Sequence, residues 1–123
     1  MILVGDSLIP FEKTFMIYHK DQISETGANS TILFTYNSDI MQYASSNDIS
    51  FAPIVTSVKE AIYANALGAK YIIVKRSFAK EIQGLADNYM FDSKVLAIIS
   101  HSGEIESIAQ DEIDGVIYKS ILE

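Results

Sequence analysis

The sequence predicts a single α/β domain built on a mainly parallel sheet, and three observations point to this class. Continuous runs of β-branched and aliphatic residues recur about every twenty positions, as expected for strands that are buried on both faces. Segments with a helical spacing of apolar residues separate the later runs. The chain has 123 residues, of which 49% are apolar, which is enough for one hydrophobic core and too little for two.

Seven runs are candidate strands. The four clearest are Thr31–Tyr36, Tyr71–Val74, Val95–Ile99 and Gly115–Tyr118. Ser50–Val55 is a weaker candidate, because Pro53 cannot donate a hydrogen bond to a neighbouring strand and so favours a sheet edge or a strand end. Two short candidates, Ile2–Val4 and Thr14–Tyr18, lie within an otherwise irregular N-terminal portion.

Helices are expected between the later strands, each beginning near a Ser or Asn that can accept hydrogen bonds from free backbone N–H groups. The four segments are Ser38–Ser45, Ser57–Leu67, Phe78–Tyr89 and Gly103–Ile113. Alternating strands and helices favour right-handed crossovers between parallel strands. We therefore expect residues 1–123 to form one three-layer domain, with a sheet of five or six strands flanked by helices in a flavodoxin-like or Rossmann-like arrangement.

Composition excludes several classes of function. Nine basic residues against sixteen acidic ones give a net charge of −7, which argues against a nucleic-acid-binding surface. The chain has no cysteine, so disulfides, cysteine nucleophiles and iron–sulfur ligation are excluded. Its two histidines, His19 and His101, are too few for a multi-histidine metal site. We expect no metal and no cofactor.

Targeting and nucleotide-binding motifs are also missing. The N-terminus lacks the basic start and long apolar stretch of a signal peptide, and no apolar run is long enough to cross a membrane. The expected location is therefore the cytoplasm, with no membrane partner. The sequence contains no Gly-x-Gly-x-x-Gly, Walker A or Gly-x-Ser-x-Gly pattern, so dinucleotide binding, P-loop nucleotide binding and serine hydrolysis are unsupported.

Two local stretches resemble known families. Residues 56–75, "TSVKEAIYANALGAKYIIVK", look like the helix-to-strand step of several α/β families. Their "ALGA…YIIVK" part is similar to the last helix–strand pair of response-regulator receiver domains. Residues 94–122 resemble the last two units of phosphate-binding (β/α)8 barrels, where Ser100–Gly103 and Lys119-Ser120 stand in the places of the phosphate-binding loops. The same stretch is similar to the C-terminal regulatory domain of pyruvate kinases. Because unrelated families match equally well, the resemblance indicates architecture rather than a particular family.

Polar residues follow the expected strands at their carboxyl ends, where ligands bind in open parallel sheets. The candidate ligand-binding residues are Asp6, Asn37, Lys75, Arg76, His101 and Ser102. Lys75, Arg76 and His101 together suit an anion such as a phosphate or a carboxylate. Helix capping alone would also explain the Ser and Asn residues among them.

The functional hypothesis is a small binding or regulatory module for an anionic ligand or a protein partner. The segments Met41–Tyr43 and Asn88–Phe91 have an interface-like composition, so we also expect a homodimer. The alternative is a small enzyme that acts on a phosphorylated or carboxylate metabolite at the strand ends. For the enzyme and for ligand binding alike, we expect the guanidinium of Arg76 to converge with His101 on one concave pocket. Side chains that point to different faces of the fold would exclude the enzyme. The identity of the ligand does not follow from the sequence.

Overall fold

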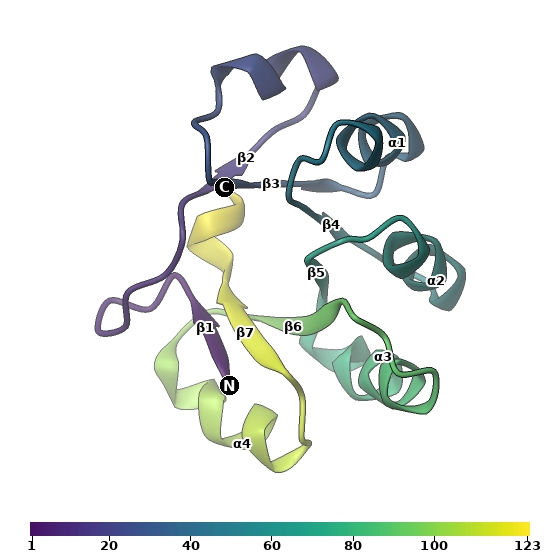
Figure 1. The fold of residues 1–123 in the computed structure, drawn as a ribbon. Helices are drawn as coiled ribbons and strands as arrows, with labels where there is room; N and C mark the ends of the chain where they lie inside the picture. Colours follow the sequence, from purple (N-terminus) through teal and green to yellow (C-terminus); the bar gives the residue numbers. More distant parts are fainter.

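A computed structural model describes residues 1–123 as a curled sheet with helices packed around its outside (Figure 1). Every candidate strand is present, the two short N-terminal ones included, and most bounds agree within a residue or two. The strands are β1 (Ile2–Val4), β2 (Thr14–Met16), β3 (Thr31–Thr35), β4 (Phe51–Ile54), β5 (Tyr71–Lys75), β6 (Lys94–Ile99) and β7 (Gly115–Tyr118).

The four expected helices are also present, and short 3-10 turns supplement them. The α-helices are α1 (Ser38–Ser46), α2 (Val58–Ala66), α3 (Arg76–Asn88) and α4 (Ile105–Gln110), and the 3-10 helices are η1 (Lys20–Glu25), η2 (Ser102–Glu104) and η3 (Lys119–Leu122). The last predicted helix therefore begins as η2 and continues as α4. The irregular N-terminal portion contains β1, β2 and η1.

All seven strands form one sheet in the order β1-β7-β6-β5-β4-β3-β2, and every neighbouring pair is parallel. The α/β class with a parallel sheet is thus confirmed, with seven strands rather than five or six. The two additional strands are the short β1 and β2, which pair at the two edges. From β3 to β7 the order in space follows the order in the chain. A flavodoxin-like or Rossmann-like sheet instead reverses its order at a switch point.

This sequential order places all four α-helices on the outer, convex face of the sheet (Figure 1). The larger core cluster, of 22 buried residues, joins these helices to the sheet and includes Phe34, Met41 and Ile82. The inner face has a smaller cluster of seven buried residues, against which Ile121 and Leu122 of η3 pack. The inner layer therefore consists of η3 and adjoining side chains, where a three-layer domain would have further helices.

Pro53 lies in an interior strand, contrary to the expectation of an edge or a strand end. β4 has β3 on one side and β5 on the other, and Pro53 is aligned with Phe34 of β3. The pairing of β4 with β5 is reduced to one aligned pair, Ile54 with Ile73. Because proline has no N–H, a ladder next to it loses a hydrogen bond. The sheet accommodates Pro53 by shortening this one ladder.

Glu12 anchors the connection between β1 and β2 to the amino ends of the strands. Its carboxylate accepts hydrogen bonds from Lys70 Nζ at 2.6 Å, from the Tyr71 hydroxyl at 2.5 Å and from Thr31 Oγ1 at 3.1 Å. Burial alone would raise the pKa of Glu12, but the donors and the charge of Lys70 outweigh it and hold the pKa below its usual value. These contacts fix residues 5–13 between the two sheet edges.

Gly115 allows β1 to approach β7 closely. A Cβ atom at this position would lie 2.5 Å from the Ile2 carbonyl oxygen and 2.8 Å from Leu96 Cδ2. The backbone oxygen cannot move away without disturbing the β1–β7 ladder, in which Ile2 is aligned with Gly115. Any side chain at position 115 must therefore displace the edge strand.

We expect Gly115→Ala to lower the free energy of unfolding by about 2 kcal/mol, the usual cost of overpacking a core position. Urea denaturation monitored by circular dichroism measures this change. The matched control is Gly84→Ala, because Gly84 lies exposed in α3 and its Cβ would meet nothing within 4 Å. Alanine in a helix interior should stabilise the protein by about 0.5–1 kcal/mol. Equal unfolding energies for the two variants would contradict the close approach at Gly115.

Candidate functional site

The candidate residues all lie at one rim, formed by the carboxyl ends of the parallel strands. Asp6 follows β1, Asn37 follows β3, and Lys75 and Arg76 stand at the junction of β5 and α3. His101 and Ser102 follow β6. Because every strand pair is parallel, these residues emerge on the same side of the sheet, as the sequence predicts. Their side chains nevertheless divide among three places on this rim.

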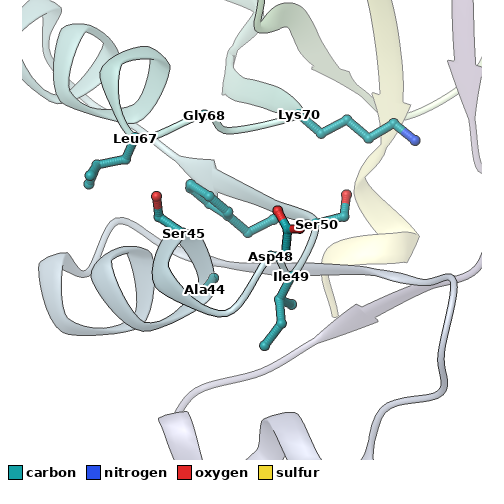
Figure 2. A pocket seen from close by; sticks show the side chains of 9 residues that line it. Ala44, Ser45, Asp48, Ile49, Ser50, Leu67, Gly68 and Lys70 are labelled. Carbon is teal, nitrogen blue, oxygen red and sulfur yellow. The ribbon is translucent and has the colours of Figure 1, made fainter.

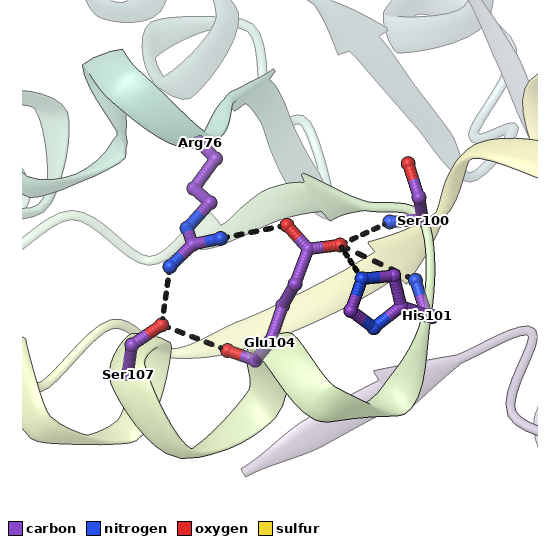
Figure 3. A network of polar contacts seen from close by, with 5 residues as sticks. All are labelled: Arg76, Ser100, His101, Glu104 and Ser107. Atoms are coloured by element: carbon purple, nitrogen blue, oxygen red, sulfur yellow. Dashed lines mark hydrogen bonds and ion pairs between the residues drawn. The ribbon is translucent and has the colours of Figure 1, made fainter.

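A hydrogen-bonded network joins Arg76 to His101 through Glu104 (Figure 3). Arg76 Nη1 donates to Glu104 Oε1 at 2.8 Å, and Arg76 Nη2 donates to Ser107 Oγ at 2.6 Å. On the other side, His101 Nε2 lies 4.0 Å from Glu104 Oε2. The side chains of Arg76 and His101 thus converge on opposite oxygens of one carboxylate.

Glu104 also closes the start of η2. Its Oε2 accepts hydrogen bonds from the backbone N–H of Ser100 at 2.6 Å and of His101 at 3.2 Å. The Ser100 N–H is the largest influence on the carboxyl group, and together with Arg76 it holds the pKa of Glu104 below its ordinary value of 4.5. The side chain is only 16% exposed. Glu104 is therefore a charged residue at the centre of the rim, and both of its carboxylate oxygens accept hydrogen bonds.

Arg76 and His101 do not share a pocket, although both contact Glu104. Arg76 lines a pocket of about 390 Å³ together with Lys75, Lys119 and Glu123. The floor of this pocket is apolar and includes Ile98 of β6. We call it the basic pocket. His101 lines a different pocket, so the convergence expected for an enzyme and for ligand binding alike is met only at Glu104.

Two cations of the basic pocket have no carboxylate partner. Arg76 is paired with Glu104, but neither Lys75 nor Lys119 has a carboxylate oxygen within 4.0 Å of its ammonium group. The same region contains the start of α3, whose N-cap residue is Lys75. A lysine cannot accept a hydrogen bond, and no side chain caps this helix. The first N–H groups of α3 therefore add positive potential beside the lysines.

The second pocket lies at the ends of β1, β6 and β7, and has a volume of about 700 Å³. Asp6, His101 and Ser102 line it, together with Tyr118 and several aliphatic side chains. Asp6 Oδ2 accepts a hydrogen bond from the Tyr118 hydroxyl at 2.6 Å. We call this cavity the Asp6 pocket. It collects three of the six candidate residues.

Asn37 belongs to neither pocket. Its side chain accepts a hydrogen bond from the Ile40 N–H at 3.0 Å and caps α1. Ser57 does the same for α2, where its hydroxyl accepts from the Glu60 N–H at 3.1 Å. The capping explanation therefore accounts for Asn37, whereas Ser102 accepts no such bond and lines the Asp6 pocket.

A further pocket of about 530 Å³ lies at the opposite end of the strands, between the C-terminal ends of α1 and α2 (Figure 2). It is lined by Asp48 and Lys70 among others, and by none of the candidate residues. Lys70 is already bound to Glu12. Helix C-termini carry negative potential, so this end of the sheet disfavours an anion.

The sequence did not identify Glu104 as part of the site, although it lies at the centre of the network. The available signal was its position three residues after His101, since a Glu at this spacing closes a capping box at a helix start. In the sequence, Tyr118 is recognisable only as the end of a strand. No sequence pattern links it to Asp6, which lies 112 positions away.

Comparison with known proteins adds no family to this description: no protein-family model matches the chain, and no curated protein matches it either. None of the helices is both long enough and apolar enough to span a bilayer. The structure contains no group of three His, Asp or Glu side chains placed to hold a metal ion. The geometry of the rim is therefore the main evidence for a function.

Glu104→Ala should lower the free energy of unfolding by about 1–2 kcal/mol at neutral pH, because the variant loses a helix cap and a charge-assisted bond to Arg76. The pKa of Glu104 is lowered on folding, so its contribution is complete above the ordinary value of 4.5 and is lost as the pH falls below it. The difference between the wild type and the variant should therefore narrow in acid.

Chemical denaturation at a series of pH values measures this difference. The control is Glu106→Ala, which removes an exposed carboxylate from the same helix and should change the stability little at any pH. A Glu104→Ala effect that stays constant down to acid pH would contradict the lowered pKa.

Proposed function

We propose that this protein is a non-catalytic binding or regulatory module, and that its ligand is a small anion held in the basic pocket. One observation carries this proposal: Lys75 and Lys119, two ammonium groups without a carboxylate partner, line the same pocket at the carboxyl ends of parallel strands. Open parallel sheets bind their ligands at this end.

Electrostatics favour an anion in this pocket. The chain carries a net charge of −7, yet three of its nine basic residues line this one pocket. Lys75 at the end of β5 and Lys119 after β7 repel each other, and an anion between them would offset this repulsion. The uncapped start of α3 acts in the same direction, because free N–H groups at a helix N-terminus are suitable donors to an anion.

The shape of the pocket limits the size of the ligand. A volume of about 390 Å³ lies near the lower end of the range for small-molecule sites. Ile98 and Leu122 provide apolar contact, and the carboxylate of Glu123 repels a second negative group on its side. A phosphorylated or carboxylate metabolite with a short apolar body fits these constraints.

The basic pocket is lined by no histidine, and this favours binding over catalysis as its role. His101, the histidine of the rim, lines the Asp6 pocket instead. The guanidinium of Arg76 already donates to Glu104 and Ser107. The position of His101 therefore gives no support to an enzyme that acts on the bound anion.

Self-association and a cytoplasmic location remain predictions. In the first candidate interface segment, Met41–Tyr43, Met41 is buried in the core. In the second, Asn88–Phe91, Tyr89 and Met90 at the end of α3 are 72% and 85% exposed. Exposed aromatic and methionine side chains support a contact with a second copy. The edge strands β1 and β2 also each lack a strand neighbour on one side.

Anion binding can be tested with inorganic phosphate, glycerol 3-phosphate and succinate, using amide shifts in nuclear magnetic resonance spectra of the labelled protein. We expect at least one of these anions to shift the amides around Lys75, Ser77 and Lys119, and glycerol to shift none. Lys119→Gln should weaken that binding by about tenfold, as expected when a charge-assisted contact is lost.

The matched control is Lys94→Gln, which removes the same charge from the amino end of β6 and should leave the affinity unchanged. Added salt should weaken binding in the wild type, because the interaction is electrostatic. Equal affinities in the two lysine variants, or no response to any of the three anions, would overturn the proposal.

A further inference from the structure

The Asp6 pocket differs from the basic pocket in both charge and shape. It is the larger of the two, at about 700 Å³. Its lining contains one carboxylate, that of Asp6, and neither lysine nor arginine. A cavity of this size with a few polar groups in an apolar wall has the usual character of a small-molecule site.

Asp6 is held in place and remains charged. Its Oδ1 accepts from the Leu8 N–H at 2.8 Å, and its Oδ2 accepts from the Tyr118 hydroxyl at 2.6 Å. The Tyr118 hydroxyl is the main reason that the pKa of Asp6 lies below its usual value. No cationic nitrogen lies within 4.0 Å of the carboxylate. Each carboxylate oxygen can accept more than one hydrogen bond, so Asp6 can receive a further donor.

The wall of the pocket is apolar beside this carboxylate. Leu8 and Ile9 are large aliphatic residues in the connection that follows β1, and they are 83% and 41% exposed. Leu3 and Ile105 extend the apolar lining from β1 and α4. A ligand in the pocket would remove these side chains from water, which is favourable in proportion to the area covered.

The Glu104 carboxylate does not compete with Asp6 for a cationic ligand in the Asp6 pocket. Its carboxylate is bound to Arg76 and to two backbone N–H groups, and it does not line the Asp6 pocket. His101 and Ser102 also line the pocket, and the Nε2 atom of His101 lies 4.0 Å from Glu104 Oε2. Asp6 is thus the single fixed negative charge that a ligand in this pocket would meet.

We propose that the Asp6 pocket binds a second ligand, a small organic ammonium ion with an apolar body. Its ammonium group donates to the Asp6 carboxylate, and its apolar part covers Leu8, Ile9 and Ile105. This site is independent of the anion site, because the two pockets share no lining residue. The rim therefore carries two binding sites of opposite charge preference.

Benzylammonium is a suitable probe, with benzyl alcohol and benzoate as its neutral and anionic counterparts. Titration into the wild-type protein, followed by amide shifts, should perturb residues around Asp6, Leu8 and Ser102 with benzylammonium. Benzyl alcohol should bind about tenfold more weakly, because it lacks the charge-assisted bond. Benzoate should give no response at this pocket. Equal responses to the three probes, or benzylammonium shifts located elsewhere, would overturn the proposal.

Variants locate the interaction on named groups. Asp6→Asn keeps a side chain that can bond to Tyr118 but removes the charge, and should weaken benzylammonium binding by about tenfold. Asp92→Asn, at an exposed position outside the pocket, should not change it. Leu8→Ser should weaken binding by about threefold through lost apolar contact. An unchanged affinity in Asp6→Asn would contradict the assignment.

The two proposals can fail separately. Lys119→Gln should reduce the affinity for the anion and leave the affinity for benzylammonium as it is, and Asp6→Asn should do the reverse. If each substitution lowered the affinities for both ligands equally, the pockets would not be independent and this second site would be excluded. The wild-type titration alone remains decisive if either variant fails to fold.

Discussion

Parallel pairing of all seven strands is the constraint on which the rest of the structure depends. It brings the carboxyl end of every strand to one rim, so that residues distant in the chain meet there. Asp6 and Tyr118, which are 112 positions apart, form a hydrogen bond because β1 lies beside β7. That pairing in turn needs a glycine at position 115, where a Cβ atom would lie 2.5 Å from the Ile2 carbonyl oxygen. Both candidate pockets are built on this arrangement.

Glu104 determines how charge is distributed along the rim. By accepting from Arg76 and from the backbone of Ser100 and His101, it neutralises the arginine and fixes the loop after β6. The ammonium groups of Lys75 and Lys119 then remain without a carboxylate partner in the basic pocket. The carboxylate of Asp6 remains without a cationic partner in the Asp6 pocket. The partly exposed Arg76–Glu104 ion pair thus joins a residue of the basic pocket to the loop that lines the Asp6 pocket.

The strands and helices could be predicted from the sequence because burial imposes local patterns. Strands covered on both faces, such as β3 and β6, need continuous apolar runs, and helix starts need acceptors such as Ser57. Strand order has no such local signal, since it depends on which edges pair after the chain collapses. The seven-stranded sheet and the position of Pro53 in an interior strand followed from those pairings.

As with the fold, local patterns in the sequence predicted where the candidate site lies but not how its side chains are arranged. Polar residues after strand ends identified the rim, which needs only the parallel class to be correct. How Lys75, Arg76 and His101 divide between two pockets depends on the direction of their side chains and on the partner each one finds. Arg76 finds Glu104, which lies 28 positions further along the chain. Contacts at that separation leave no trace in local composition.

The single aligned pair between β4 and β5 also has a consequence for motion. It is the shortest ladder of the sheet, and it divides β1, β7, β6 and β5 from β4, β3 and β2. Hydrogen bonds from the Lys70 N–H to the Phe51 carbonyl and from the Val55 N–H to the Ile73 carbonyl, both 2.8 Å long, flank it. Both pockets are built almost wholly on the first group of strands. An opening of the backbone beside Pro53 would therefore part β2, β3 and β4 from the four strands that carry the two candidate pockets.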